Sequence, residues 1–260
     1  MSKPVELNYK QMGEGFPIVV LHGLFGMLDN LQLFGKALSE HDYMVYLVDQ
    51  RNHGRSPRNN DFSYPALATD LLHFMETHWL HRTVLIGHSM GGKAALQFVK
   101  DHSDHVTKLV IIDIGIKKYE GGHETIFEAL SSLPLNETDS REAAFNKLKQ
   151  SIGDESVVHF LMKNLTRNKE THAFEWKMNL PVLVKNYYNI LDSVPFDGPL
   201  DTEVLFIRGD RSNYIQDEDI PEIKKYFPNA SFVTIPNAGH WIHVDNLPVL
   251  ISEIISFLKT

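Results

Sequence analysis

Six short apolar runs recur along the chain, and each is hydrophobic at consecutive rather than alternating positions. They cover residues 18–21, 44–48, 83–86, 109–112, 204–207 and 232–235. Continuous hydrophobicity over four or five residues predicts strands that are covered on both faces, as in a parallel sheet. Apolar residues with helical spacing lie between and after these runs, at residues 31–38, 65–79, 91–100, 220–227 and 247–258. The pattern therefore predicts an α/β fold with a mostly parallel sheet and helices on both of its faces.

The alternation of runs and helical segments stops between residues 116 and 200. Apolar residues there have helical spacing at residues 124–130, 140–151, 155–164 and 180–191, and no convincing strand pattern occurs. A structureless connection of this length is uncommon inside a compact domain. We therefore predict a core made of residues 1–115 and 201–260. Residues 116–200 are expected to form an inserted helical cap that folds over the strand ends and shapes a substrate pocket.

Composition narrows the classes of function. The chain has 260 residues, of which 43% are hydrophobic, so it can bury a large core. A formal net charge of −8 disfavours nucleic acid or an anionic membrane as the main partner, because both attract clustered Lys and Arg. The absence of cysteine excludes disulfides, thiolate metal ligands and a cysteine nucleophile. No apolar stretch approaches the roughly 18 residues of a membrane span, and we expect a cytoplasmic protein.

The motif Gly-His-Ser-Met-Gly at residues 87–91 follows one apolar run and precedes a helical segment. This context is typical of a nucleophile elbow, in which a serine stands on a sharp turn between a strand and a helix. The turn brings the residues two before and two after the serine into close contact, which favours glycine at both positions. The sequence therefore predicts Ser89 as a nucleophile, and the backbone N–H of Met90 as a donor to a developing oxyanion.

Two further segments fit the same chemistry. His22-Gly23-Leu24 follows the run at residues 18–21, and there the N–H of Leu24 would be the second oxyanion donor. His240 lies after the last run, in a polar loop that contains glycine, where the general base of a serine nucleophile is expected. Phe25 and Trp241 are candidates for an apolar substrate-binding lining beside the serine.

Taken together, these segments resemble the α/β-hydrolase superfamily over nearly the whole chain. Residues 49–56, 209–214 and 237–243 are most similar to the YbfF-type esterases and their mitochondrial relatives. The resemblance implies an α/β-hydrolase fold with a helical cap, and a small cytosolic carboxylesterase or acyl thioesterase. It also implies Ser89 and His240 as catalytic residues, with an acid that carries over to Asp113.

The acid of this constellation is open between two carboxylates. In the fold it commonly lies three residues beyond a glycine after the penultimate strand, and here that position holds Ser212. Asp210 lies in the same turn, whereas Asp113 follows the run at residues 109–112. We favour Asp113, because a lone carboxylate at a strand end would be costly without a hydrogen-bonded partner. The segment at residues 49–56 is interpreted as a brace that acts through arginine–carboxylate contacts.

The predicted activity is hydrolysis of a small-molecule ester or thioester, including acyl-CoA, through an acyl-enzyme on Ser89. No cofactor is required, and no metal site is expected, because the sequence has no H-E-x-x-H motif and its histidine pairs lack accompanying carboxylates. One alternative is a C–C lyase of the same fold, in which the serine need not be acylated. Another is a non-catalytic member that binds a ligand. Activity on simple esters distinguishes the hydrolase from both.

Overall fold

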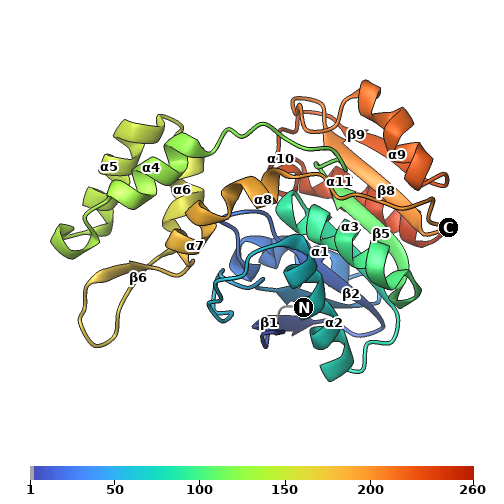
Figure 1. Ribbon diagram of the computed structural model, residues 1–260, viewed down its shortest axis with the longest axis horizontal. Coiled ribbons are helices and arrows are strands. Elements are labelled where there is room, and N and C mark those ends of the chain that lie inside the picture. Colours follow the sequence, from blue (N-terminus) through green and yellow to red (C-terminus); the bar gives the residue numbers. More distant parts are fainter. Residues whose placement is uncertain (1–2) are drawn as a thin grey trace.

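The computed structural model describes residues 3–260. Within this part of the chain, the main sheet has seven strands. They are β1 (Tyr9–Met12), β2 (Phe16–Leu21), β3 (Tyr43–Val48), β4 (Thr83–His88), β5 (Val106–Ile112), β8 (Glu203–Gly209) and β9 (Ser231–Ile235). Their order across the sheet is β1-β3-β2-β4-β5-β8-β9 (Figure 1). Only the β1–β3 pair is antiparallel among these seven, so the predicted, mostly parallel α/β architecture is confirmed.

Helices cover both faces of the sheet because its central strands are apolar on both faces. Successive residues of a strand point to opposite sides, so Val19 and Leu21 join one apolar cluster while Ile18 and Val20 join the other. The first cluster is shared with α2 (Tyr64–Thr77), α3 (Met90–His102) and α9 (Ile220–Tyr226). The second is shared with α1 (Gln32–Ser39) and α11 (Leu247–Leu258). The carboxyl ends of the strands remain free of both layers, and loops leave the sheet there.

The edge strand β1 was not predicted from the sequence. Its four residues are exposed or half-buried and include Lys10 and Gln11, so it has no apolar run. It pairs through its backbone with β3, with Tyr9 opposite Val48 and Met12 opposite Val45. Side-chain patterning cannot indicate a strand that is held mainly by backbone hydrogen bonds at a solvent-facing edge.

Between β5 and β8 the chain leaves the sheet and forms a mainly helical segment. Its helices are α4 (Glu124–Ser132), α5 (Arg141–Ile152), α6 (Glu155–Met162), α7 (Leu180–Lys185) and α8 (Tyr187–Leu191). Figure 1 shows α4, α5 and α6 grouped to one side of the sheet, with α7 and α8 leading back to it. The predicted helix at residues 180–191 is thus divided in two, and the break falls at Asn186.

The expectation that residues 116–200 contain no strand was wrong. A small hairpin pairs β6 (Leu165–Arg167) with β7 (Phe174–Trp176) in antiparallel register. Phe174 and Trp176 are buried on the same side of β7, while Arg167 is exposed and lies over the Phe174 ring. Three residues are too short to produce a recognisable alternation, and the hairpin is held by its packing against the neighbouring helices.

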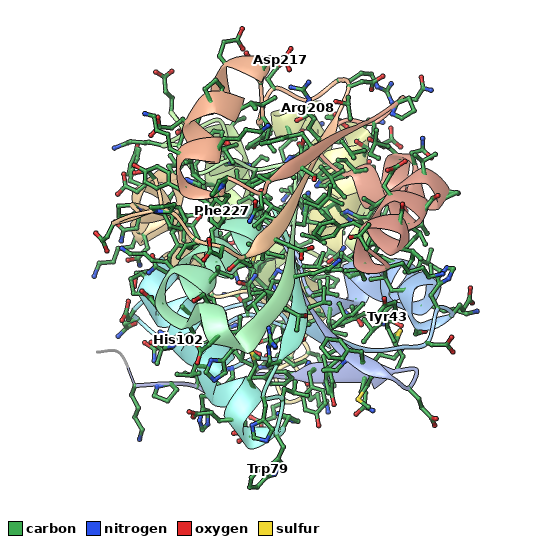
Figure 2. The ribbon with its side chains drawn as sticks, turned by 90° about the vertical axis from the view of Figure 1, so that its right-hand side faces the viewer. Tyr43, Trp79, His102, Arg208, Asp217 and Phe227 are labelled. Carbon is green, nitrogen blue, oxygen red and sulfur yellow. The ribbon has the colours of Figure 1, made fainter. Side chains whose placement is uncertain are left out.

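The loop after β8 is fastened at both of its ends. Arg208 forms an ion pair of 2.6 Å with Asp217 in the 3-10 turn η4 (Asp217–Asp219), and Figure 2 shows the two side chains together at one end of the molecule. Phe227, just after α9, is fully buried against Phe206 of β8. These contacts hold residues 209–214 over the end of the sheet.

Candidate active site

The motif at residues 87–91 forms the predicted sharp turn between β4 and α3. Ser89 has φ 53° and ψ −121°, a left-handed backbone conformation that non-glycine residues rarely adopt. A Cβ atom at Gly87 would lie 2.3 Å from the carbonyl oxygen of Gly91, and one at Gly91 would lie 2.5 Å from that of Leu21. Both positions therefore require glycine, and the strained turn raises the Ser89 hydroxyl above the strand end.

Three side chains from distant parts of the chain form a hydrogen-bonded series at this end of the sheet. The Ser89 Oγ lies 3.0 Å from Nε2 of His240, and Nδ1 of His240 lies 2.7 Å from Oδ2 of Asp113. Asp113 is fully buried and follows the last residue of β5. Because the carboxylate accepts a hydrogen bond from Nδ1–H, the proton of the neutral ring stays on Nδ1, and Nε2 is free to accept the serine proton.

The carboxylate of Asp113 has two further partners from the loop after β8. The backbone N–H of Gly209 donates to Oδ1 at 3.2 Å, and the Ser212 hydroxyl donates to Oδ2 at 2.5 Å. Ser212 occupies the position that commonly holds the acid in this fold. Here it hydrogen-bonds to a carboxylate that comes from the neighbouring strand, so the hydroxyl helps to satisfy the buried charge.

Asp210 has a different environment from Asp113. Its carboxylate accepts the backbone N–H groups of Asn237 at 2.9 Å and Ala238 at 3.0 Å. These bonds, first that from Asn237, hold the pKa of Asp210 below its usual value. Asp210 therefore ties the loop after β8 to the loop that carries His240, and Asp113 contacts the imidazole.

Two further residues, Tyr214 and His88, hold His240 in place. The ring of Tyr214 stacks on it with a centroid distance of 4.0 Å and an interplanar angle of 20°. Nε2 of His88 donates to the backbone carbonyl of His240 at 2.8 Å. The only sequence signal for Tyr214 is its place in the turn after the penultimate strand. The stacked Tyr214 ring restricts the rotation of the imidazole, and the bond from His88 fixes the backbone that carries it.

The two predicted oxyanion donors, Met90 and Leu24, come from the elbow itself and from a loop that packs against it. Met90 is the first residue of α3, and Leu24 lies in the loop after β2. A Cβ atom at Gly23 would lie 3.0 Å from the His88 ring and 3.2 Å from Cβ of Ser89, so glycine allows this loop to approach the serine without displacing its neighbours. Leu24 and Ser89 line the same two cavities.

Two cavities meet at Ser89. The larger has a volume of about 420 Å³, and its apolar lining includes Phe25, Ile126, Val157, Phe160, Leu161 and Trp241. The smaller has a volume of about 270 Å³, and its apolar lining includes Tyr64, Met90, Ile114, Tyr119, Ile190 and Leu191. The side chains of Leu24, Ser89 and His123 belong to both. Phe25 and Trp241, the two candidates for substrate binding, thus both line the larger cavity.

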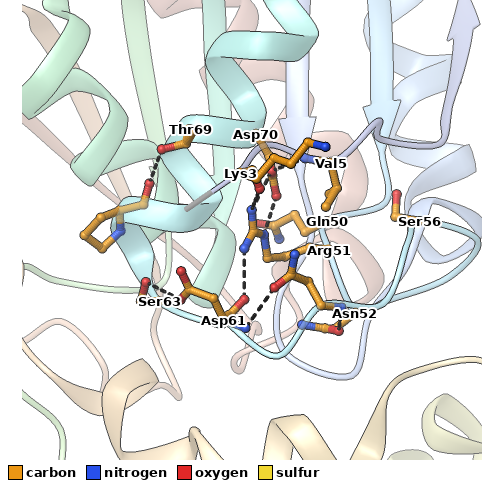
Figure 3. A network of polar contacts seen from close by, with 12 residues as sticks. Lys3, Val5, Gln50, Arg51, Asn52, Ser56, Asp61, Ser63, Thr69 and Asp70 are labelled. Carbon is orange, nitrogen blue, oxygen red and sulfur yellow. Dashed lines mark hydrogen bonds and ion pairs between the residues drawn. The ribbon is translucent and has the colours of Figure 1, made fainter. Parts of the chain in front are cut away.

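The loop at residues 49–56, which follows β3, braces the loops around the site. The Arg51 guanidinium binds both carboxylate oxygens of Asp70 on α2, at 2.5 and 2.7 Å, and it donates to the carbonyl of Asp61 (Figure 3). Burial raises the pKa of Asp70, and Arg51 opposes that shift. Gln50, which precedes Arg51, donates from its side-chain amide to the backbone carbonyl of His22 at 2.6 Å. The brace therefore extends to the loop that carries Leu24.

Five histidines around the site are buried and have lowered pKa values. Burial lowers the pKa of His22, His123 and His243 to about 4 and that of His53 to about 3, and it holds that of His88 well below its usual value. All five rings are therefore neutral at neutral pH. Among the contacts of residues 3–260, His240 hydrogen-bonds to the Ser89 hydroxyl, and these five histidines do not.

Acid is expected to destabilise the protein strongly because of these histidines. Between pH 6.5 and about 4, the unfolded chain binds protons that the folded chain does not, so the free energy of unfolding falls as the pH falls through this range. One pKa unit corresponds to about 1.4 kcal/mol, which predicts a loss of several kcal/mol between pH 7 and pH 4. Urea denaturation at a series of pH values measures this slope. His53→Gln should flatten it, whereas His41→Gln, at an exposed position, should not.

The described residues contain neither a metal site nor a membrane span. No group of three or more His, Cys, Asp or Glu side chains within residues 3–260 is placed to hold a metal ion. In the same range, every helix is too short or too polar to cross a bilayer.

Comparison with known proteins agrees with this fold. The family model for the alpha/beta hydrolase fold matches residues 17–247. Esterase YbfF of Escherichia coli is 35% identical over 247 residues, which cover 94% of this chain and 93% of that protein. The sn-1-specific diacylglycerol lipase ABHD11 of Danio rerio is 33% identical over 268 residues, which cover 99% of this chain and 84% of that protein.

A solved structure extends the match to three dimensions. A marine microorganism esterase superposes with a TM-score of 0.95 at 40% sequence identity, over 97% of this chain and 99% of that one. The similarity in sequence and in backbone therefore extends along almost the entire length. The chain belongs to the alpha/beta hydrolase fold family and, within it, to the group of hydrolases that contains esterase YbfF.

Proposed function

We propose that this protein hydrolyses carboxylic esters through an acyl-enzyme on Ser89. The observation that carries the proposal is the hydrogen-bonded series from Ser89 through His240 to Asp113. In this proposal His240 is the general base, Asp113 orients and stabilises its ring, and the N–H groups of Leu24 and Met90 form the oxyanion hole. The esterase and lipase names of the relatives support the same class of reaction.

The reaction would proceed in two halves. Ser89 Oγ bonds to the ester carbonyl carbon while its proton moves to Nε2 of His240, and the carbonyl oxygen becomes the oxyanion. When the carbon–oxygen bond of the alcohol breaks, Nε2 returns the proton to the leaving oxygen. Water then attacks the acyl-enzyme with His240 again as the base, and the carboxylic acid leaves while Ser89 regains its proton.

The two cavities support a substrate with a substituent on each side of the ester. Because both open at Ser89, one can hold the acyl group and the other the alcohol. We propose that Phe25 and Trp241 contact the part in the larger cavity. Residues 116–200 would act as a cap, since Ile126, Val157 and Phe160 contribute to the walls of that cavity.

Neutral oxyesters are the preferred substrate class in this proposal, and acyl thioesters are the second. The larger cavity is also lined by Asp154 and Asp245, and hydrogen bonds from Ser156 and Val157 hold the pKa of Asp154 below its usual value. Two carboxylates at this wall repel the phosphates of an acyl-CoA. The net charge of −8 acts in the same direction.

A matched substrate panel tests the proposed function. We expect the purified protein to hydrolyse p-nitrophenyl esters, with kcat/KM at least tenfold higher than for the acyl-CoA of the same acyl chain. A fluorophosphonate should label Ser89. Labelling without turnover of any ester or thioester would favour the C–C lyase alternative. Absence of both would favour a ligand-binding protein without catalysis.

A further inference from the structure

Lys93 is a buried cation in the helix that begins at the nucleophile. It lies one helical turn after Ser89 in α3, and its backbone N–H donates to the Ser89 carbonyl at 3.1 Å. The residue is only 1% exposed. Lysine is almost never buried to this extent unless its ammonium group is satisfied by specific partners.

The partners of this ammonium group are three backbone carbonyls. Nζ donates to Lys117 at 2.8 Å, to Leu191 at 3.2 Å and to Asp192. An ammonium group has three N–H donors, so these three acceptors match its full capacity. The ring of Tyr119 adds a cation–π contact with its centroid 4.8 Å from Nζ. The charge is thus solvated by the protein backbone and an aromatic ring.

The three carbonyls lie on the two stretches that connect the sheet with the helical segment. The outgoing crossing, residues 113–123, joins β5 to α4, and the returning crossing, residues 191–202, leads from the end of α8 to β8. The crossings also bond to each other, because Tyr119 N–H donates to Leu191 at 2.9 Å and Val194 N–H donates to Ile116 at 3.1 Å. Lys93 joins this pair of crossings to α3.

The same crossings build the smaller cavity. Tyr119 and Leu191 line it directly, and so does Ile190, whose carbonyl accepts the Tyr64 hydroxyl at 2.7 Å. Met90 forms another part of the wall and belongs to α3, as Lys93 does. The distance between α3 and the crossings therefore sets the width of this cavity next to Ser89.

We propose that Lys93 is a positioning residue that ties both crossings to α3 and thereby fixes the wall of the smaller cavity. It determines which ester substituents fit beside Ser89, and it does not touch the reacting atoms. Its effect on substrate choice rests on the proposed ester hydrolysis, whereas its effect on the crossings does not.

A nearby lysine provides a matched control. Lys118 in the outgoing crossing pairs with the Asp192 carboxylate of the returning crossing at 3.1 Å, but this ion pair is exposed on both sides. Exposed pairs contribute little, because water and salt screen them. Lys93→Met and Lys118→Met therefore each remove an amino group that links the same two crossings. The two sites differ in burial and in the contact with α3.

The first measurement is hydrogen exchange, which requires no activity. In Lys93→Met we expect the amides of residues 117–119 and 190–194 to exchange at least tenfold faster than in the wild type. In Lys118→Met their exchange rates should stay within about threefold of the wild-type rates.

The second measurement is kcat/KM on two ester series, one varied in the acyl group and one in the alcohol. In Lys93→Met the ratio of kcat/KM between the largest and the smallest ester of one series should change at least tenfold, mainly through KM. The rate at which a small fluorophosphonate labels Ser89 should stay within threefold of the wild-type rate.

The proposal fails if Lys93→Met folds and leaves both exchange and size preference unchanged, or if it lowers kcat equally for every ester. Absence of Ser89 labelling in the wild type would instead reject the proposed function and leave the exchange result standing.

If Lys93→Met does not fold, lysine acetylation of the wild type provides the test. Burial lowers the pKa of Lys93 to about 7, so at pH 7 the ammonium coexists with the reactive neutral amine, and access to the side chain limits the rate of acetylation. The acetylation rate of Lys93 should not exceed the rate at which the amides of residues 117–119 and 190–194 open to hydrogen exchange. More rapid acetylation would overturn the proposal.

Discussion

Ser89→Ala is expected to lower kcat for ester hydrolysis by on the order of 10⁶, which is the loss measured when the nucleophile of another serine triad is removed. The physical reason is that the hydroxyl forms the covalent bond to the substrate, and no other side chain hydrogen-bonds to Nε2 of His240 among the contacts of residues 3–260. Water admitted to the site would be an unactivated and poorly oriented substitute. Initial rates on a p-nitrophenyl ester, with active-site titration of the wild type, measure this change.

The fold of the Ser89→Ala variant should be preserved, because the sharp turn depends on Gly87 and Gly91 and not on the hydroxyl. Its midpoint of thermal unfolding should lie within a few degrees of the wild type. Ser103→Ala, at the end of the same helix, controls for a general effect of losing a hydroxyl from α3. A Ser89→Ala variant that keeps more than about one hundredth of the wild-type rate would reject the acyl-enzyme on Ser89.

Asp113→Asn is expected to lower kcat by on the order of 10⁴. A carboxylate can only accept a hydrogen bond, so it holds the proton of His240 on Nδ1 and leaves Nε2 free to accept from Ser89. An asparagine amide can instead donate to Nδ1, which places the ring proton on Nε2 and removes the base. It also loses the negative charge that stabilises the imidazolium. Steady-state kinetics and the pH dependence of kcat/KM measure both effects.

Asp210→Asn is the matched comparison, because it makes the same chemical change in the adjacent loop. Its carboxylate accepts from Asn237 and Ala238 rather than from His240, so we expect less than a tenfold loss in kcat. A lower thermal midpoint is expected, since the bonds that hold the loop before His240 are weakened. If Asp210→Asn were the more damaging of the two in kcat, the role of the acid would belong to Asp210.

Much of the arrangement around Ser89 follows from local rules that can be recognised in the sequence. Continuous apolar runs predict buried parallel strands, and polar or glycine-rich loops at their ends predict where reactive groups gather. The Gly-His-Ser-Met-Gly motif predicts its own backbone, because only glycine fits where the turn closes on itself. Chain order then selects His240 among 14 histidines. Each of these inferences depends on residues that are neighbours along the chain.

Local rules favoured Asp113 over Asp210, but they could not show which carboxylate reaches His240. Asp113 and His240 are far apart in the sequence, and they meet because β5 lies beside β8 in the sheet and the His240 loop follows β9. The stacking of Tyr214 on the imidazole depends on the same arrangement. The short hairpin of β6 and β7 was missed for a related reason, since its strands are stabilised by surrounding helices and not by a pattern of their own.

The sequence by itself determined the α/β class, the position of the nucleophile elbow and the candidate base, because strand burial and glycine sterics act over a few consecutive residues. Only the tertiary structure decided that Asp113 contacts His240, that Ser212 hydrogen-bonds to that carboxylate, and that the Lys93 ammonium joins two distant crossings. These contacts depend on strand order and on packing between segments that are remote in the chain. Side-chain type and local spacing carry no information about which of several polar partners will be brought within hydrogen-bonding distance.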